Sequence, residues 1–181
     1  MPVAFRIELL DQGWLIPSDP DGDLCSHGHL RLTVGGVEVV GGHASYGISE
    51  SALAMLRTLA ADHTAEAPVA DRMIFHGCGT MLMMGCPIGA SFSVRHRGGV
   101  VSIGSVVRYD TTNEDQGIRF PSLEVEVPAA EYQSEVLKFA LRARGLFIGA
   151  TKRFADDFDA KQYHDFWAEF DQILANSGHA A

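Results

Sequence analysis

The sequence predicts an α+β fold with a mostly antiparallel sheet built from hairpins. Two pairs of adjacent glycines, Gly35-Gly36 and Gly98-Gly99, each interrupt a run rich in alternating apolar residues. Such two-residue connections are typical of tight hairpins. From Pro128 onward the apolar residues instead recur every three or four positions, which is the spacing of amphipathic helices. Strands that come first and helices that come last indicate an α+β arrangement rather than alternating parallel units.

The first strand is expected within residues 3–10, before a loop that is rich in Pro, Asp and Gly. The segment "HLRLTVGGVEVVGG" then predicts a hairpin with a primed turn, because glycine tolerates positive φ at both turn positions. In that register Val34 faces Val37 and Leu32 faces Val39, on one face of the sheet.

A helix is predicted in "ISESALAMLRTLAADH", between the two sheet regions. We expect Ser49 to cap its amino terminus and Ile48 to pack beside the cap as a hydrophobic staple. Its apolar stripe consists of Leu53, Leu56, Leu59 and Ala60.

The second sheet region is expected from Met73 to about Tyr109, with its turn at Gly98-Gly99. If these glycines form a two-residue connection, the facing pairs are Val94 with Ile103, Phe92 with Ser105, and His96 with Val101. The segment "SLEVEV" alternates cleanly between apolar and acidic residues, and it predicts the last strand.

Two helices are expected after the last strand. Pro128 is well placed in a first helical turn, where its missing N–H costs little. The first apolar stripe comprises Tyr132, Val136, Phe139, Ala140, Ala143 and Phe147, and the second comprises Tyr163, Phe166, Trp167, Phe170, Ile173 and Leu174. We interpret residues 1–181 as a single domain, with a sheet-rich part at 1–127, a helical part at 128–175 and a tail at 176–181.

The charge of the chain excludes some classes of partner. Its 14 basic and 23 acidic residues give a net charge of −9, with no cluster of Lys and Arg to offset it. Such a surface repels phosphate, so we expect neither nucleic-acid binding nor adhesion to an anionic membrane. The amino-terminal residues do not resemble a signal peptide, and no apolar run is long enough to span a membrane. Three cysteines, an odd number, favour reduced thiols and a cytoplasmic location.

The segment "FHGCGTMLMMGC", residues 75–86, combines histidine, cysteine and methionine. We interpret it as a core strand, since free cysteine and methionine most often pack as buried apolar residues. In a straight strand Cys86 would lie about 33 Å from His76. Cys78 could also act as a nucleophile with His76 as its base, although no third orienting group is indicated.

A metal site is the alternative interpretation of this segment. The earlier segment "CSHGH" contains two histidines at the same two-residue spacing. Two adjacent strands could then bring together His27, His29, His76 and Cys78 as four ligands. The sequence "DPDGD" begins like a calcium loop, but Leu24 and Leu30 occupy the positions that need Gly and Glu. We expect no bound metal and no cofactor.

Acidic residues crowd the last helix and the loop before it, against only one lysine, Lys161. The candidate partner-binding residues are Asp156, Asp157, Asp159 and Asp165. Carboxylates at the start of a helix favourably oppose its dipole, which is one explanation of the cluster. The other explanation is an acidic patch that docks a basic partner, with aromatic residues such as Tyr163 and Trp167 as anchors.

The order of predicted strands and helices resembles that of bacterial polymorphic-toxin immunity proteins, and also that of bacterial families that are uncharacterised. The segments "LRLTVGGVEVVGG", "ISESALAMLRTL" and "YHDFWAEFDQIL" carry this resemblance. The resemblance implies stoichiometric binding and inhibition of a toxin, without catalysis. We therefore expect a non-enzymatic interaction protein that binds a basic protein such as a toxin. The alternative is a small metal- or thiol-dependent enzyme that uses His27, His29, His76 and Cys78.

Overall fold

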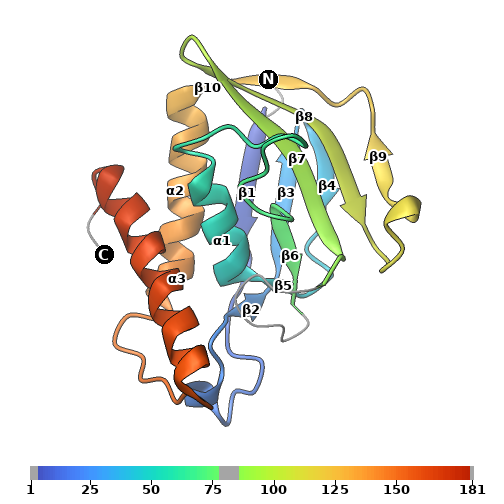
Figure 1. Cartoon of the computed structure of the whole chain (residues 1–181). Coiled ribbons are helices and arrows are strands. Elements are labelled where there is room, and N and C mark those ends of the chain that lie inside the picture. The colour runs from blue at the N-terminus through green and yellow to red at the C-terminus, as the bar shows by residue number, and fades with distance from the viewer. Residues whose placement is uncertain (1–3, 78–85, 180–181) are drawn as a thin grey trace.

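The computed structural model describes residues 4–77 and 86–179 of the chain. Figure 1 shows the three α-helices together on one side of the molecule and the long strands β7 and β8 on the other. In chain order the elements are β1 (Phe5–Leu9), the 3-10 helix η1 (Pro20–Gly22), β2 (His27–Gly28), β3 (Leu30–Val34), β4 (Val37–Val40), β5 (Tyr46–Gly47), α1 (Ile48–Arg57), β6 (Ile74–His76), β7 (Gly89–Arg97), β8 (Val100–Tyr109), the 3-10 helix η2 (Glu114–Gln116), β9 (Ile118–Phe120), β10 (Val125–Pro128), α2 (Ala129–Gly145) and α3 (Asp157–Asn176).

The described strands form two antiparallel sheets. One sheet has the order β1-β3-β4, and the other has the order β10-β8-β7-β6-β5-β2, with β9 paired to β8. Helix α1 lies between strands in the sequence, and α2 and α3 follow the last strand and pack against the sheets. The predicted α+β class is therefore confirmed.

Both diglycine turns are confirmed. Gly35 and Gly36 have φ angles of 57° and 78°, and Gly98 and Gly99 have φ angles of 59° and 86°. Positive φ at both turn positions is the conformation that a primed two-residue turn requires and that glycine adopts without a steric penalty.

The register of the first hairpin holds at the turn and shifts beyond it. Val34 pairs with Val37, as predicted. Leu32 pairs with Val40 and not with Val39, because the register shifts by one residue between Leu32 and its neighbour Thr33. The prediction assumed a regular ladder, and a bulge of this kind leaves no clear mark in the pattern of apolar residues.

The second hairpin contains a similar irregularity. The predicted pairs Val94–Ile103 and His96–Val101 are confirmed. The predicted pair of Phe92 with Ser105 is wrong, because the β7–β8 register shifts between Ser91 and Ser93. Phe92 is buried in the core, and its ring centroid lies 6.2 Å from that of Phe5.

The predicted amino-terminal cap of α1 is wrong. Gly47, the last residue of β5, occupies the cap position, and Ser49 lies inside the helix. The Ser49 hydroxyl accepts a hydrogen bond from the Ser26 N–H at 2.9 Å. The helix starts directly from a strand, so neighbouring strands and not a capping side chain hold its first turn. The helix ends at Arg57, and Leu59 therefore lies beyond it.

The two carboxy-terminal helices follow the predicted stripes. The buried residues of α2 are Tyr132, Val136, Leu137, Phe139, Ala140 and Ala143, and those of α3 are Phe166, Trp167, Phe170 and Leu174. Pro128 is the residue before the first turn of α2 and not part of that turn, because it also ends β10. Over residues 4–77 and 86–179, no helix combines the length and the apolarity that a membrane crossing requires.

We expect the variant Glu50→Gln to change how stability depends on pH. Burial raises the pKa of Glu50, and hydrogen bonds from Cys25 and Ser49 only partly oppose this effect. The folded chain therefore keeps a proton that the unfolded chain releases above its ordinary pKa of 4.5. Wild-type stability should fall as the pH rises from there through the folded pKa of Glu50.

Glutamine does not titrate, so Glu50→Gln should gain stability relative to the wild type as the pH rises. Urea unfolding at about pH 5 and about pH 8 measures the difference. An identical pH dependence in both proteins would contradict a neutral buried Glu50.

Candidate functional site

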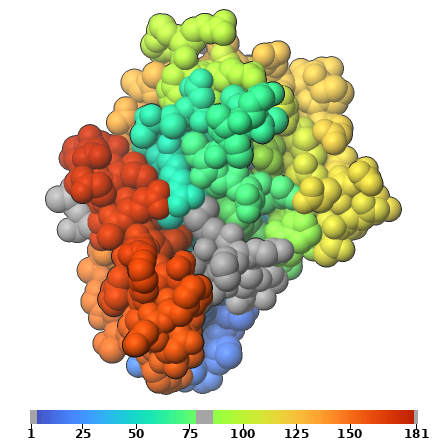
Figure 2. Space-filling view, viewed as in Figure 1, coloured from blue at the N-terminus to red at the C-terminus, as the bar shows by residue number. Residues whose placement is uncertain are grey.

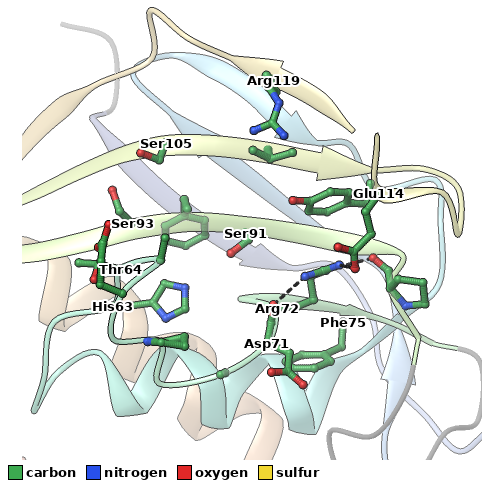
Figure 3. A pocket seen from close by; sticks show the side chains of 18 of the residues that line it. His63, Thr64, Asp71, Arg72, Phe75, Ser91, Ser93, Ser105, Glu114 and Arg119 are labelled. Carbon is green, nitrogen blue, oxygen red and sulfur yellow. Dashed lines mark hydrogen bonds and ion pairs between the residues drawn. The ribbon is translucent and has the colours of Figure 1, made fainter. Parts of the chain in front are cut away.

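A hollow of about 770 Å³ opens on the outer face of strands β7 and β8. Its floor is made by residues of these two strands, including Ser91, Ser93 and Ser105. One wall is the segment 63–72, which follows α1, and the opposite wall is formed by β9 and η2. Figure 3 shows these side chains around one shared space. A hollow of this volume suits a small organic molecule.

The floor of the hollow is shaped by the irregular part of the β7–β8 pairing. Ser105 has a φ angle of 51° and is the only residue other than glycine with a positive φ in the described parts of the chain. A serine whose backbone is in the left-handed conformation costs about 1–3 kcal/mol of strain, and such strain is concentrated at functional sites. The hydroxyls of Ser91, Ser93 and Ser105 make no hydrogen bond to described residues. They are therefore available to a ligand.

His63 is a buried histidine in the wall of the hollow. It forms an isolated bridge to Val94 of β7. The His63 backbone N–H donates to the Val94 carbonyl with an N-to-O distance of 2.9 Å, and the Val94 N–H donates to the His63 carbonyl at 2.8 Å. The His63 Nδ1 accepts a hydrogen bond from the Val69 N–H at 3.1 Å. Burial lowers the pKa of His63 below its ordinary value, which favours the neutral ring at pH 7. In that form the proton is on Nε2, which is thus a donor.

Arg72 closes one end of the hollow. Its guanidinium donates to the carbonyl oxygens of Pro87 at 3.0 Å and Asp71 at 2.9 Å, and it forms an ion pair with Glu114. It also lies over the ring of Tyr109, 4.3 Å from the centroid. Figure 3 shows this group at the end of the hollow next to η2. Since all sides of the guanidinium are engaged, Arg72 has a structural role.

Two other arginines at the hollow have no such partners. Arg95 of β7 and Arg119 of β9 line it, are exposed, and form no ion pair with a described residue. No hydrogen bond joins His63 to a serine of the floor, so these side chains do not form a nucleophile and its base. The arrangement is suited to binding.

The first two predicted metal ligands, His27 and His29, contact different carboxylates. The Nε2 atom of His27 lies 3.4 Å from the Asp23 carboxylate, and the Nδ1 atom of His29 lies 2.9 Å from the Asp11 carboxylate. The hydrogen bond with His29 holds the pKa of Asp11 below its ordinary value. Within the described residues, no three His, Cys, Asp or Glu side chains are grouped to hold a metal.

The other two predicted ligands, His76 and Cys78, both belong to the segment 75–86. Cys78 lies outside the described residues, so its part in the proposed cluster stays a prediction. The Sγ atom of Cys86 lies 3.7 Å from the Nδ1 atom of His76. The interpretation of this segment as a core strand falls mostly on residues 78–85, which lie outside the described residues, so it stays a prediction. The contact of His76 with Cys86 differs from the separation of about 33 Å that a straight strand would give. Strand β6 ends at His76, and no spacing in the sequence indicated its contact with Cys86.

Local structure explains some of the acidic residues on α3. The Asp156 carboxylate caps the helix by accepting the Asp159 N–H at 2.9 Å. Asp165 pairs with Lys161 one turn before it. Asp157 is exposed and forms no ion pair with a described residue. Capping and the helix dipole therefore account for only part of the cluster.

Lys152 joins the loop at residues 11–25 to the segment before α3. Its ammonium donates to the carbonyl oxygens of Pro20 at 2.8 Å and Asp23 at 2.6 Å. It also lies 3.3 Å from the centroid of the Trp14 ring. Burial lowers the pKa of Lys152, so these contacts must stabilise its charge. The sequence alone gave no indication that these two segments meet.

Arg153 makes the next contact between the same segments. Its guanidinium pairs with Asp19 at 2.7 Å, and its backbone N–H donates to the Asp21 carbonyl at 2.8 Å. Asp19 and Asp159 line one hollow of about 340 Å³ beside Arg153. The "DPDGD" segment therefore lies against the start of α3.

We call the carboxylates of these two segments the acidic end and define it as Asp19, Asp21, Asp156, Asp157, Asp159 and Asp165. Asp19 and Asp159 meet at one hollow, and Arg153 and Lys161 pair with Asp19 and Asp165 within this group. Large apolar side chains are exposed in the same two segments, with Leu15 at 51%, Ile16 at 55% and Phe158 at 56%. Figure 2 shows the blue amino-terminal segment beside the orange start of α3 at the lower end of the molecule.

Comparison with known proteins gives no relative from which a function could be transferred. No protein-family model, no curated protein and no solved structure matches the chain. The resemblance to immunity proteins therefore stays a prediction from the sequence. The two surfaces described above are the basis for any functional conclusion.

We expect Arg72→Lys to destabilise the chain by about 1–3 kcal/mol, because an ammonium cannot reproduce the planar set of hydrogen bonds and the ring contact. The matched control is Arg119→Lys, an exposed position without an ion pair, which should change stability by less than about 0.5 kcal/mol. Urea unfolding of both variants measures the difference. Equal stability of the two variants would show that Arg72 does not hold the end of the hollow together.

Proposed function

We propose that this chain is a non-enzymatic interaction protein whose acidic end binds a basic protein. The observation that carries the proposal is the exposure of Phe158 between Asp157 and Asp159, beside the acidic loop that Lys152 and Arg153 hold in place. An apolar side chain surrounded by carboxylates is a suitable anchor for a partner that presents an apolar pocket with a basic rim.

Charge and apolar area would have different effects on this binding. The exposed carboxylates would accelerate encounter with a basic partner and select against acidic ones, and salt would weaken this contribution. The exposed apolar residues Leu15, Ile16 and Phe158 would supply most of the affinity once they are covered. Binding of this kind should depend strongly on one or two apolar anchors and only moderately on each carboxylate.

The resemblance to immunity proteins suggests the class of partner. We infer a toxin that is inhibited by stoichiometric binding in the cytoplasm. The odd number of cysteines and the net charge of −9 support the location and the basic partner.

A thiol-dependent enzyme is the second candidate, and the contact between Cys86 and His76 is the observation that favours it. The described histidines His27 and His29 contact different carboxylates, and no three possible metal ligands are grouped among the described residues, which gives no support to a shared metal centre. The binding proposal explains more of the described surface.

The test is to isolate a partner from cells that naturally produce the chain and to titrate the purified partner by calorimetry. The partner should be basic, and Phe158→Ser should weaken binding about tenfold or more. Asp157→Lys should weaken it less, and its effect should decrease with added salt.

Two exposed positions away from the acidic end provide matched controls. Ile118→Ser on β9 removes an apolar side chain that is 42% exposed, and Glu126→Lys on β10 reverses an exposed charge. Both variants should bind like the wild type. An acidic partner, or equal losses in the control and test variants, would contradict the proposal.

A further inference from the structure

The hollow on β7 and β8 is separate from the acidic end, and none of the acidic-end residues lines it. Its lining includes three guanidinium groups, from Arg72, Arg95 and Arg119, and three carboxylates, from Glu66, Asp71 and Glu114. The lining is therefore neutral on a chain whose net charge is −9. An anion would meet much less repulsion here than over the acidic end.

The two arginines without ion pairs are placed on two sides of the floor. Arg119 pairs in register with Val107, and Val107 pairs with Ser91, so these residues share one row across three strands. Arg95 lies four residues farther along β7, which corresponds to about 13 Å at the rise of a strand. Arg119 also lies two strands to the side of β7, so the Cα atoms of Arg95 and Arg119 are about 16 Å apart. A ligand that contacts both guanidinium groups must therefore span several ångströms between two long side chains that reach toward it.

The carboxylates near these arginines do not neutralise them by direct contact. Glu114 is already paired with Arg72. Glu66 and Asp71 are exposed on the segment 63–72 and form no ion pair with a described residue. Arg95 and Arg119 therefore keep donors for a ligand, and a guanidinium pairs best with the planar or tetrahedral oxygens of a carboxylate or phosphate.

The floor between the arginines offers further polar contacts. Ser93 is 8% exposed, and its hydroxyl has no hydrogen-bond partner among the described residues although it lines the hollow. The strained Ser105 adds a second hydroxyl, and the neutral ring of His63 adds the Nε2 donor. Such a set of short, fixed donors complements the hydroxyl and oxyanion oxygens of a small polar molecule.

We propose that this hollow binds a small organic oxyanion, namely a carboxylate or phosphate on a polar body. Arg95 and Arg119 bind its charge, and Ser93, Ser105 and His63 bind the polar body. The Arg72–Glu114 pair closes one end and limits the length of the ligand. This inference is independent of the binding proposed for the acidic end.

The test is titration of the ¹⁵N-labelled full chain with inorganic phosphate and, separately, with citrate, followed by NMR. Millimolar binding is expected, with shifted amide signals in β7, β8 and β9 around the floor. Arg95→Gln and Arg119→Gln should each weaken binding about tenfold, since each removes a charge-assisted contact. Both side chains are exposed and form no ion pair with described residues, so the variants should fold normally.

Arg97→Gln is the matched control, because Arg97 lies on the same strand two residues beyond Arg95, is exposed, and does not line the hollow. It should leave binding unchanged. Tighter binding of phosphate would identify a phosphate ester as the natural ligand class, and tighter binding of citrate would identify a carboxylate. Absence of binding of both anions, or an equal loss in Arg97→Gln, would overturn the proposal.

Discussion

Both surfaces of this protein depend on the burial of α1 around almost its whole circumference. Nine of its ten residues are buried, including polar residues in its first turn. Buried polar groups are tolerated only when they are hydrogen-bonded. Ser51 donates to the Gly47 carbonyl at 2.6 Å and accepts the Phe75 N–H at 3.0 Å, while Ser49 accepts the Ser26 N–H. The start of the helix is thereby joined to strand β6 and to Ser26, the residue before β2, and its position is fixed by specific bonds as well as by apolar packing.

The carboxy-terminal end of α1 and the chain that follows it contact the elements that form both surfaces. Arg57 forms a two-pronged ion pair with Glu169 of α3, with distances of 2.6 and 2.7 Å, so the helix that bears the acidic end is held against α1. The chain that leaves α1 then bridges to β7 at His63 and becomes the wall of the hollow. The two surfaces differ in charge and chemistry, one acidic with exposed apolar side chains and the other neutral with unpaired donors. The basic protein and the small anion that we propose as ligands would therefore bind at separate places.

The sequence was sufficient to predict elements whose cause is local. Diglycine turns and regular apolar spacing predicted both hairpins and the two last helices, because backbone freedom and periodicity are properties of neighbouring residues. The cap of α1 and the pair of Phe92 with Ser105 were predicted wrongly, since contacts with distant strands decide both. The acidic residues of α3 were evident in the sequence, but their proximity to the loop at residues 19–23 depends on contacts of Lys152 and Arg153. The hollow was missed because its residues come from separate segments between His63 and Arg119 that only folding brings together.

The most direct test of this account is native-state hydrogen exchange of the Phe75 and Ser26 amides, which donate to the serines of α1. If the buried start of α1 fixes the whole arrangement, these amides should exchange only when the entire chain unfolds. Their free energy of exchange should then equal the free energy of global unfolding. Exchange of these amides through a smaller opening, while the β7–β8 amides remain protected, would contradict the central position given to α1.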